Sequence, residues 1–441
     1  MSLSPENTAN GRHPIHLRLH ADAAWIPLAQ GMAGQAGAVF CLDRGKILRL
    51  TMAAEEILAY LAAQAPDEIL EITCTPGASH VALEFAFTAA DADLWAMNIT
   101  AGGVSDTEDD MRAMGLMLAA RMSDGFEIRR EGGRVVLGLR MNRPYPEIKR
   151  GPITPVPMRG TPVAKPAEDP ARISEACRLA LSLYPTGLVP AEFATPGMIV
   201  DQIRAGDLGA ALAEDDGGSV RGFLIWKQTS AASATFCGPY VFAPDAGQSA
   251  RVLTDHLVNH VARTAVTGLL SELATSDLPR EDFELLGELP LLDADGRRAP
   301  LPLWYRGLRE DNGLTILAHR DLEPFLEDAY ARLFLVRDIR PAQDQGAGLV
   351  PHSVLAARLR PAASQALLTP MLDGADIGTN LKRHVDLLLG EGYRNILLHL
   401  DLSVGWQAAL PPILAGAGFQ PVVVLPFAGR ADVVVFQHAR A

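Results

Sequence analysis

A segment in the middle of the chain, CGPYVFAPDAGQSARVLTDHLVNHV, has the pattern of a strand, a short glycine-containing loop and a helix. The N–H groups in the first turn of a helix have no partner within the helix, and they can bind the oxygen atoms of a phosphate. Gly247, Gln248, Ser249 and Ala250 would lie at this turn. The pattern therefore indicates a place for a pyrophosphate-bearing cofactor.

Two other patterns in this segment are compatible with chemistry. His256 and His260 are four residues apart, a spacing suited to a metal ion, but no glutamate accompanies them in an HExxH arrangement. An exposed or hydrogen-bonded pair is the alternative. Cys237 would be a nucleophile only with a base beside it, and the sequence shows none, so a buried strand thiol is the alternative. Neither pattern predicts a metal site.

The elements that would position this segment lie between residues 171 and 308. Helical spacing is found in RISEACRLALSLY, GMIVDQIRAG and REDFELLGEL. Strand-like runs are DLGAALAEDD, SVRGFLIWKQT, TGLLSELATSD and PLPLWYRGL. Residues 309–441 repeat the end of this order, with two strands, a loop and helix, a strand, the helix GWQAALPPILAGAGF and a final hairpin. The sequence therefore predicts a domain followed by a half repeat of it.

A separate unit precedes these two. Residues 13–142 read as a strand, two helices, a hairpin, a helix and a second hairpin, with the apolar residues of ILRLTMAAEEILAYLAAQA on one helical face. Residues 143–170 contain most of a proline-dense stretch, which predicts a stiff linker whose last part enters the next domain as a strand. The whole chain is predicted to be α+β.

The N-terminal unit resembles the anti-sigma-factor kinase branch of the histidine-kinase-like ATPases, through the strings LRLTMAAEEILAYLAAQ and MRAMGLMLAARMSDGFEIRREGGRVVLGLRM. The resemblance implies a sandwich with a helical asparagine for magnesium and a DxGxG box. Here Tyr60 stands four residues after Glu56, FTAADADLWAMN has no glycine, and Gly115 alone is left of the glycine-rich lid. Magnesium needs oxygen ligands, and close approach to phosphate needs small residues. We expect a degenerate domain that does not bind ATP and that docks a protein partner.

Residues 160–308 resemble the Gcn5-related N-acetyltransferases, through VAKPAEDPARISEACRLALSLY, AALAEDDGGSVRGFLIW and the segment described first. The resemblance implies a splayed pair of parallel strands that holds acetyl-CoA, with its pyrophosphate on a glycine-rich loop. That loop here is PDAGQSARV, in which Asp245 adds a negative charge and no arginine opens the loop. The C-terminal counterpart, DGADIGTNLKR, carries two glycines and two acids.

The same resemblance implies roles for four other residues. N-acetyl transfer needs a base, an oxyanion donor and a proton for the departing thiolate. Glu272 would be the base, and a solvated acid at a strand end is the alternative. Tyr305 would donate the proton, and packing beside Trp304 is the alternative. Backbone N–H groups near Tyr240 and Val241 would stabilise the oxyanion.

The composition limits the classes of partner. The formal net charge is −13 and no long basic block occurs, which argues against nucleic-acid binding. No apolar run reaches about 20 residues, so neither a membrane helix nor a secretory signal is predicted. The four cysteines form no CxxC pair, which favours a reduced, cytoplasmic protein. A homodimer is compatible with the sequence.

Two functional hypotheses follow. The first is an acyl-CoA-dependent N-acyltransferase, or a descendant of one, fused to a regulatory ATPase-like domain. The second is a non-catalytic binding protein in which both nucleotide-type sites have decayed and the folds recognise a partner or ligand. The splayed strands favour the first hypothesis, and the poor phosphate loop favours the second.

Overall fold

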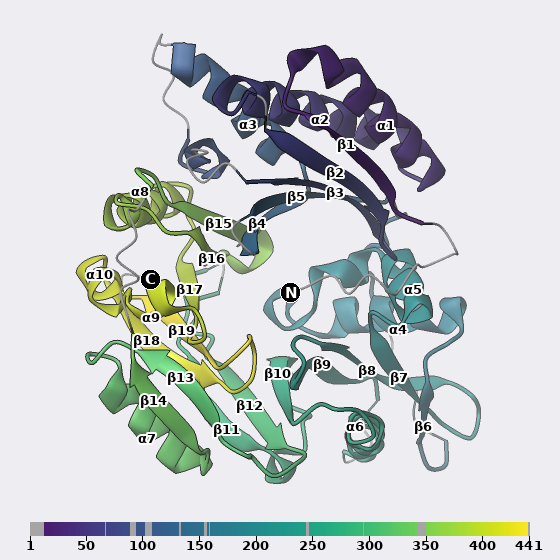
Figure 1. The fold of residues 1–441 in the computed structure, drawn as a ribbon. Coiled ribbons are helices and arrows are strands. Elements are labelled where there is room, and N and C mark those ends of the chain that lie inside the picture. The colour runs from purple at the N-terminus through teal and green to yellow at the C-terminus, as the bar shows by residue number, and fades with distance from the viewer. Residues whose placement is uncertain are drawn as a thin grey trace.

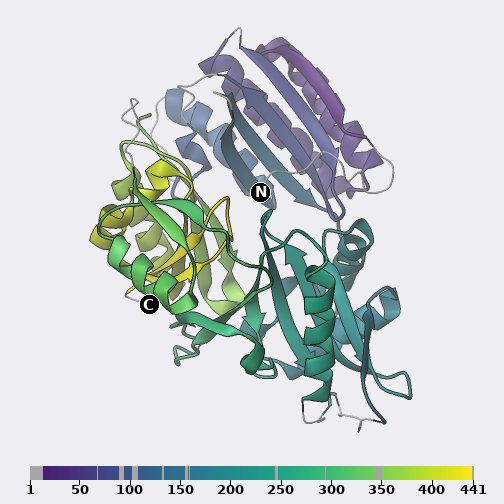
Figure 2. The same cartoon turned by 60° about the horizontal axis from the view of Figure 1, so that its bottom comes forward.

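The computed structural model describes most of the chain in three parts that lie against one another (Figures 1 and 2). The described residues are 13–66, 68–88, 94–101, 108–131, 134–153, 157, 159–243, 247–293, 295–342 and 350–439. The predicted α+β class is confirmed, since the described residues form several sheets covered by helices. No helix in these ranges combines the length and the apolar character needed to cross a membrane.

The N-terminal part has two layers. A five-stranded antiparallel sheet in the order β1-β2-β3-β5-β4 carries three helices on its outer face (Figure 1). Its elements are β1 (Ile15–His20), α1 (Ile26–Val39), α2 (Arg44–Gln64), β2 (Ile69–Pro76), β3 (His80–Phe87), α3 (Glu108–Met122), β4 (Gly125–Glu131) and β5 (Arg134–Asn142).

Helix α2 fixes the core of this part. The Asp43 side chain accepts a hydrogen bond from the Lys46 N–H and caps the helix, and the predicted apolar face is buried. Tyr60 lies on this buried face. Gly115 faces the carboxylate of Glu56, which would have to move if a Cβ atom were present. Gly115 therefore lies at the contact between α2 and α3.

The middle part is a seven-stranded sheet in the order β11-β12-β10-β9-β8-β7-β6. Helix α6 packs on one face (Figure 2), and α4 packs on the other. The elements are β6 (Val163–Pro166), α4 (Pro170–Leu183), α5 (Pro196–Ala205), β7 (Gly209–Glu214), β8 (Val220–Gln228), β9 (Ser233–Val241), α6 (Gln248–Val261), β10 (Gly268–Ala274), β11 (Glu284–Leu289) and β12 (Leu301–Gly307).

The C-terminal part has a second sheet in the order β15-β16-β17-β19-β18 and a separate pair, β13-β14. The five strands repeat the order and directions of β8, β9, β10, β12 and β11, with one parallel pair in the centre of each set. The elements are β13 (Leu314–Ala318), α7 (Glu323–Leu333), β14 (Arg337–Pro341), β15 (Val354–Arg360), β16 (Gln365–Leu372), α8 (Ile377–Gly390), β17 (Asn395–Asp401), α9 (Gly405–Ala408), α10 (Pro411–Gly416), β18 (Phe419–Leu425) and β19 (Val433–His438).

Two predicted helices differ from the structure. The segment 280–289 was expected to be helical because Phe283, Leu286 and Leu289 are three residues apart, but after one 3-10 turn it forms strand β11. A shift in register between Leu285 and Gly287 breaks the strict alternation, so buried residues recur at a helix-like spacing. The predicted helix at 405–419 is divided into α9 and α10, because proline ends the preceding helical turn.

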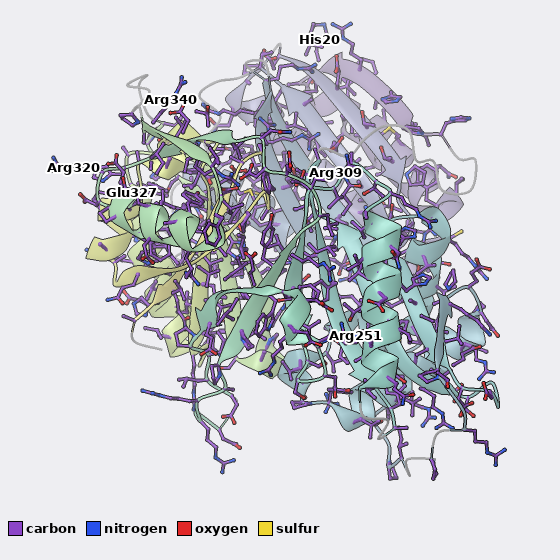
Figure 3. The ribbon with its side chains drawn as sticks, turned by 90° about the horizontal axis from the view of Figure 1, so that it is seen from below. His20, Arg251, Arg309, Arg320, Glu327 and Arg340 are labelled. Atoms are coloured by element: carbon purple, nitrogen blue, oxygen red, sulfur yellow. The ribbon has the colours of Figure 1, made fainter. Side chains whose placement is uncertain are left out.

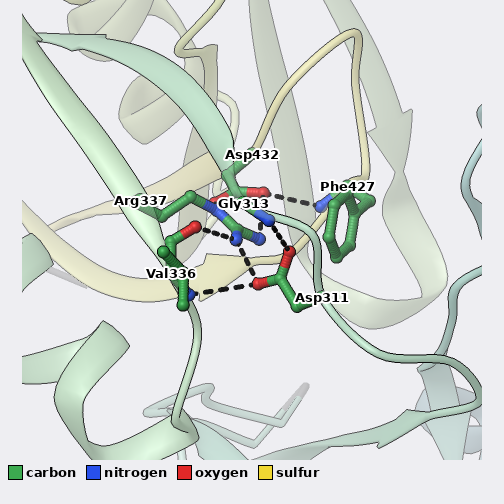
Figure 4. A network of polar contacts seen from close by, with 6 residues as sticks. All are labelled: Asp311, Gly313, Val336, Arg337, Phe427 and Asp432. Carbon is green, nitrogen blue, oxygen red and sulfur yellow. Dashed lines mark hydrogen bonds and ion pairs between the residues drawn. The ribbon is translucent and has the colours of Figure 1, made fainter.

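A buried ion network joins the segment that follows β12, strand β14 and the loop that precedes β19 (Figure 4). Arg337 pairs with Asp432 at 2.6 Å and with Asp311 at 2.5 Å, and its side chain is 1% exposed. The guanidinium also lies 4.6 Å from the centre of the Phe427 ring. Asp432 in turn accepts the N–H of Phe427. The network therefore holds the loop between β18 and β19 in place.

Candidate functional site

The candidate site begins where the two central parallel strands of the middle sheet separate. β9 and β10 pair as far as Gly238 and Ala274. Beyond this point Phe242 donates its N–H to the carbonyl of Arg221, in β8. Neighbouring residues of a strand direct their backbone groups to opposite edges, so the N–H and C=O of Val241 face the gap beside β10. This is the predicted region of splayed strands.

A tyrosine side chain bridges the gap. The Tyr184 hydroxyl accepts the N–H of Val241 at 2.6 Å. The same oxygen lies 3.0 Å from the Val241 carbonyl and 2.7 Å from a carboxylate oxygen of Asp277, which follows β10. A hydroxyl has one proton, so it donates to one of these two acceptors at a time. The backbone group predicted to stabilise an oxyanion is therefore already hydrogen-bonded within the chain.

A second hydroxyl lies near the first. Thr275, also after β10, donates its hydroxyl to the carbonyl of Pro239 at 2.5 Å. The C-terminal sheet has the same arrangement, because the Gln407 amide donates to the carbonyl of Pro370 at 3.0 Å and accepts the N–H of Asp401 at 2.9 Å. In both sheets the separating parallel strands are thus joined by side chains of the chain itself.

The start of α6 presents a small open surface next to this gap. Gly247 has a left-handed backbone, and a Cβ atom built on it would meet no atom within 4 Å. Gly247 and Gln248 are exposed, whereas Ser249 and Ala250 are fully buried against the sheet. Among the predicted loop residues only the first two can therefore meet a ligand directly. Asp245 lies outside the described residues.

The arginine in the first turn of α6 is occupied by acids. Arg251 forms ion pairs with Glu281 and Asp282, on the segment that precedes β11. Figure 3 shows Arg251 on the exposed flank of this helix. A guanidinium shared by two carboxylates attracts a phosphate less strongly than one without acidic partners. The pairing thus weakens the phosphate-binding character of the loop.

The corresponding loop of the C-terminal sheet is covered by the chain. A Cβ atom on Gly374 would lie 2.3 Å from the backbone nitrogen of Ser353, so the two backbones are in direct contact. Asp376, immediately before α8, accepts hydrogen bonds from both the N–H and the hydroxyl of Ser353. Its carboxylate lies where a phosphate would have to bind. Asp376 and Ser353 therefore occupy the start of α8, beside a cavity of about 280 Å³ that Asn98, Asp376 and Asn380 line.

The segment FTAADADLWAMN, where the resemblance predicted a DxGxG box, also makes an internal contact. Its last residue, Asn98, is buried and hydrogen-bonds with the backbone of Ser353 and Leu355, both at 2.9 Å. Asn380 of α8 completes the cluster. The FTAADADLWAMN segment therefore docks, through Asn98, on β15 of the C-terminal sheet. Residues 89–93 of this segment lie outside the described ranges.

Glu272 lies in the middle of β10 and points into a cavity between the two large sheets. It pairs with Arg360 at 2.8 Å and with Lys227 at 3.2 Å. Burial alone would raise the pKa of Glu272, but Lys227 and Arg360 outweigh burial and lower the pKa to about 2. The carboxylate is thus ionised at neutral pH and has little affinity for a proton. Its role as a base stays a prediction that this pairing disfavours.

Tyr305 is distant from the gap along the sheet. It is buried and pairs with Leu270, four residues before the end of β10, which corresponds to roughly 13 Å at the usual rise of a strand. Burial raises the pKa of Tyr305 to about 12. The structure does not bring Tyr305 together with Val241 or Gly247, and it places the ring in the core, as the packing alternative expected.

The remaining predicted groups are in the core or on a helix face. Tyr240 is fully buried and donates its hydroxyl to the Leu188 carbonyl at 2.8 Å. Cys237 is buried, and burial raises the pKa of its thiol. His256 and His260 both lie against Trp226, with ring centres 6.2 and 5.1 Å away, and they line a second cavity of about 590 Å³.

The residues that close the gap were not found from the sequence. Tyr184 is 57 residues from Val241 and 93 from Asp277, so no local pattern connects them. Gln407 looked like an ordinary residue of a predicted helix. The repeated proline in β9 and β16 is the one local signal, because Pro239 and Pro370 both present a carbonyl that a side chain binds.

Comparisons with known proteins give structural neighbours for about a third of the chain. No family profile matches the sequence, and no curated protein matches it. A phosphinothricin acetyltransferase from Sinorhizobium meliloti, in complex with AcCoA, shares 16% identity over 34% of this chain and 91% of its own, with a TM-score of 0.28. An N-acetyltransferase from Staphylococcus aureus shares 15% identity over 34% of this chain and 100% of its own, with a TM-score of 0.29. A GNAT family N-acetyltransferase from Escherichia coli, in complex with CoA, shares 13% identity over 36% of this chain and 86% of its own, with a TM-score of 0.25.

Proposed function

We propose that the middle part is an acyl-CoA-dependent N-acyltransferase module whose acyl donor binds along β9. The supporting observation is that the glycine at the start of α6, Gly247, is exposed and has open space around it beside a strand edge. Gly374 and Gly115, the glycines of the other two predicted nucleotide positions, are buried. An extended chain with amide groups can pair with such an edge as an added strand would.

The bridge from Tyr184 would act as a gate in this proposal. A donor that pairs with the N–H of Val241 has to displace the Tyr184 hydroxyl, which is a side-chain group able to rotate away. In the reaction an amine nitrogen attacks the thioester carbonyl, the carbon–sulfur bond breaks, and the thiolate receives the proton that the amine loses. Glu272 is too weak a base to drive this deprotonation, so water or the substrate itself would have to accept the proton first.

A calorimetric titration with acetyl-CoA tests the proposal. We expect saturable heat with the native protein, and about fivefold tighter binding to Tyr184→Phe, because one competing hydrogen bond of about 1 kcal/mol is removed. Gly247→Glu should abolish binding by adding charge to the open surface. Gly392→Glu is the matched control, since Gly392 has the same backbone conformation and the same open surroundings at the end of α8.

The second candidate is a non-catalytic binding protein, and the closed gap favours it. Tyr184 and Thr275 already bind the backbone groups that a donor would need. Absence of heat for both the native protein and Tyr184→Phe at millimolar acetyl-CoA would reject the acyltransferase proposal and favour this candidate. Saturable heat of acetyl-CoA binding that is unchanged in Gly247→Glu would mean that the donor does not bind at the start of α6.

We propose a regulatory, partner-docking role for the N-terminal part, with a homodimer as one form of it. Apolar side chains on the outer helices support this role, because Trp25, Leu28, Leu48 and Val39 are 46–60% exposed. These side chains belong to α1, α2 and the turn before them. The N-terminal part would then supply the surface that contacts the partner. We do not expect it to bind ATP.

A further inference from the structure

The side chains that line the cavity between the two large sheets carry an excess of positive charge. It measures about 360 Å³ and is lined by β8–β12 of the middle sheet and β15–β19 of the C-terminal sheet. Three cations, Lys227, Arg358 and Arg360, face one carboxylate, Glu272. His399 also lines the cavity, and burial together with Arg358 lowers its pKa to about 4, so it is neutral at pH 7. Three positive charges against one negative leave an excess of two in a chain whose net charge is −13.

One of these cations forms no close ion pair with a described residue. Lys227 and Arg360 both pair with Glu272, whereas Arg358 forms no hydrogen bond or close ion pair in the part of the chain that the structure describes and interacts with Glu272 and Glu192 only at longer range. Arg358 is exposed, so its guanidinium is accessible from solvent. An arginine presents several N–H donors in one plane, which suits a carboxylate or a phosphate.

A buried hydroxyl in the same cavity is also unsatisfied. The Thr235 hydroxyl oxygen is buried and makes no hydrogen bond to any described residue. His399, which is half-buried, lines the same cavity. A buried polar group without a partner costs about 1–3 kcal/mol, so native proteins rarely keep one unless water or a ligand satisfies it.

The rest of the wall is apolar. Leucine and valine side chains from both sheets complete the lining, and Leu270, Leu303, Leu367, Leu397 and Val435 are among them. A ligand that fits has to combine a charged head with an apolar body, and the volume is at the lower end of the range for small-molecule pockets.

We propose that this inter-sheet cavity binds a small organic dianion with an apolar body, held at its head by Arg358, Thr235 and His399. The two negative charges match the excess of positive charge, and the leucines and valines contact the body. A phosphate monoester and a dicarboxylate share this chemistry. The site is independent of the proposed acyl donor, which would bind at the start of α6.

The other large cavity does not have these properties. Its charged lining residues are balanced, with Arg204 and Lys227 against Glu168 and Asp207. Its histidines pack on Trp226. The inter-sheet cavity therefore carries the proposal, since it combines excess charge with unsatisfied donors.

Calorimetry of the full chain at pH 7.5 with five probes tests the proposal. Phenyl phosphate and phthalate are dianions with a ring, benzoate is a monoanion, benzyl alcohol is neutral, and inorganic phosphate lacks the ring. We expect at least one of the two dianions to bind, at least fivefold tighter than benzoate and at least tenfold tighter than inorganic phosphate. The preferred dianion identifies the head group as phosphate or dicarboxylate. Benzyl alcohol should give no saturable heat.

Variants locate the binding. Arg358→Gln should weaken the preferred dianion at least tenfold and Thr235→Val at least threefold, whereas Arg358→Lys should retain part of the affinity. Arg320→Gln is the matched control, because Arg320 is an exposed arginine on the outer flank of the C-terminal part (Figure 3). Saturating acetyl-CoA should not displace the dianion.

Three results would overturn the proposal. They are no binding of either dianion up to 10 mM, equal affinity for the dianions and benzyl alcohol, and unchanged affinity in Arg358→Gln. Failure of acetyl-CoA to bind would leave these outcomes unaffected, so the two proposals can be tested separately.

Discussion

The gap between β9 and β10 differs from the cavity between the two sheets in whether its polar groups have hydrogen-bond partners within the chain. In the gap, Tyr184 and Thr275 satisfy the backbone of β9. In the cavity, the Thr235 hydroxyl has no hydrogen-bond partner among the described residues, and Arg358 forms no hydrogen bond or close ion pair with them. A protein gains stability by satisfying buried groups, so groups that are left unsatisfied are the better indication of ligand binding.

The gap therefore has the separated parallel strands that were predicted, but side chains of the chain already bind its backbone groups. The cavity is lined by β9 and β10 before the point at which they separate, and its Thr235 hydroxyl and Arg358 guanidinium remain available to a ligand. The fold determines where the strands lie, but ligand binding depends on which side chains between the strands are free to contact a ligand.

The largest effect is expected for the ion network of Figure 4. Arg337→Met leaves the buried carboxylates of Asp432 and Asp311 without their cation, and breaking such a pair costs about 3–5 kcal/mol. The free energy of unfolding from urea denaturation measures it. The loop that Asp432 holds carries Ala428, which lines the cavity, so dianion binding should be lost as well.

Arg340→Met is the control for this prediction. Arg340 also pairs with an acid, Asp338, but its side chain is 65% exposed, and exposed pairs contribute only about 0–1 kcal/mol. Equal losses in Arg337→Met and Arg340→Met would show that the buried network is not what stabilises the wall.

Much of the fold is predictable from the sequence because its signals are local. The alternation in SVRGFLIWKQT and the repeated order of strands in residues 309–441 correspond to β8 and to the second five-stranded sheet. Strand β11 was mistaken for a helix because a register shift places Phe283, Leu286 and Leu289 at a helical spacing. A bulge depends on the pairing with β12, which a single segment does not reveal.

The cavity could not be predicted for a related reason. Glu272 was predicted to be a catalytic base, with a solvated acid at a strand end as the alternative, but its partners Lys227 and Arg360 come from β8 and from the second sheet. Arg358 and Arg360 appear in the sequence as two ordinary arginines of one strand, LAARLR. Only the packing of one sheet against the other shows that they face the same carboxylate.

The next effect concerns the pH dependence of the ion cluster in the cavity. Lys227 and Arg360 lower the pKa of Glu272 to about 2, below its ordinary value of 4.5, despite the opposing effect of burial. The unfolded chain therefore binds a proton more readily than the folded one. The stabilisation is fully present above pH 4.5 and is lost as the pH falls toward 2. We expect this loss to be about 2–3 kcal/mol.

Denaturation of the native protein and of Glu272→Gln at pH 7, 4 and 3 measures this contribution. The difference between the two should shrink as the pH falls, because the glutamine side chain of the variant does not titrate. Glu327→Gln, at an exposed position on α7, should keep a constant difference from the native protein. A difference between native protein and Glu272→Gln that does not change with pH would contradict the pairing.

The smallest effects concern two hydroxyl groups, and they should have opposite signs. Tyr184→Phe removes the acceptor of the Val241 N–H and leaves that group and Asp277 without this partner, which should cost about 1–3 kcal/mol of unfolding free energy. Thr235→Val removes a hydroxyl that has no hydrogen bond to a described residue and keeps a similar shape, so it should be neutral or stabilise by up to about 1 kcal/mol. Urea denaturation of both variants without ligand measures the two changes in the free energy of unfolding.

A loss of unfolding free energy in Thr235→Val as large as that in Tyr184→Phe would mean that the Thr235 hydroxyl is hydrogen-bonded in solution. The contrast between gap and cavity would then disappear. We expect Thr235→Val to be more stable than the native protein and to bind the dianion less well. This result would show that the Thr235 hydroxyl contributes to ligand binding while it lowers the free energy of unfolding.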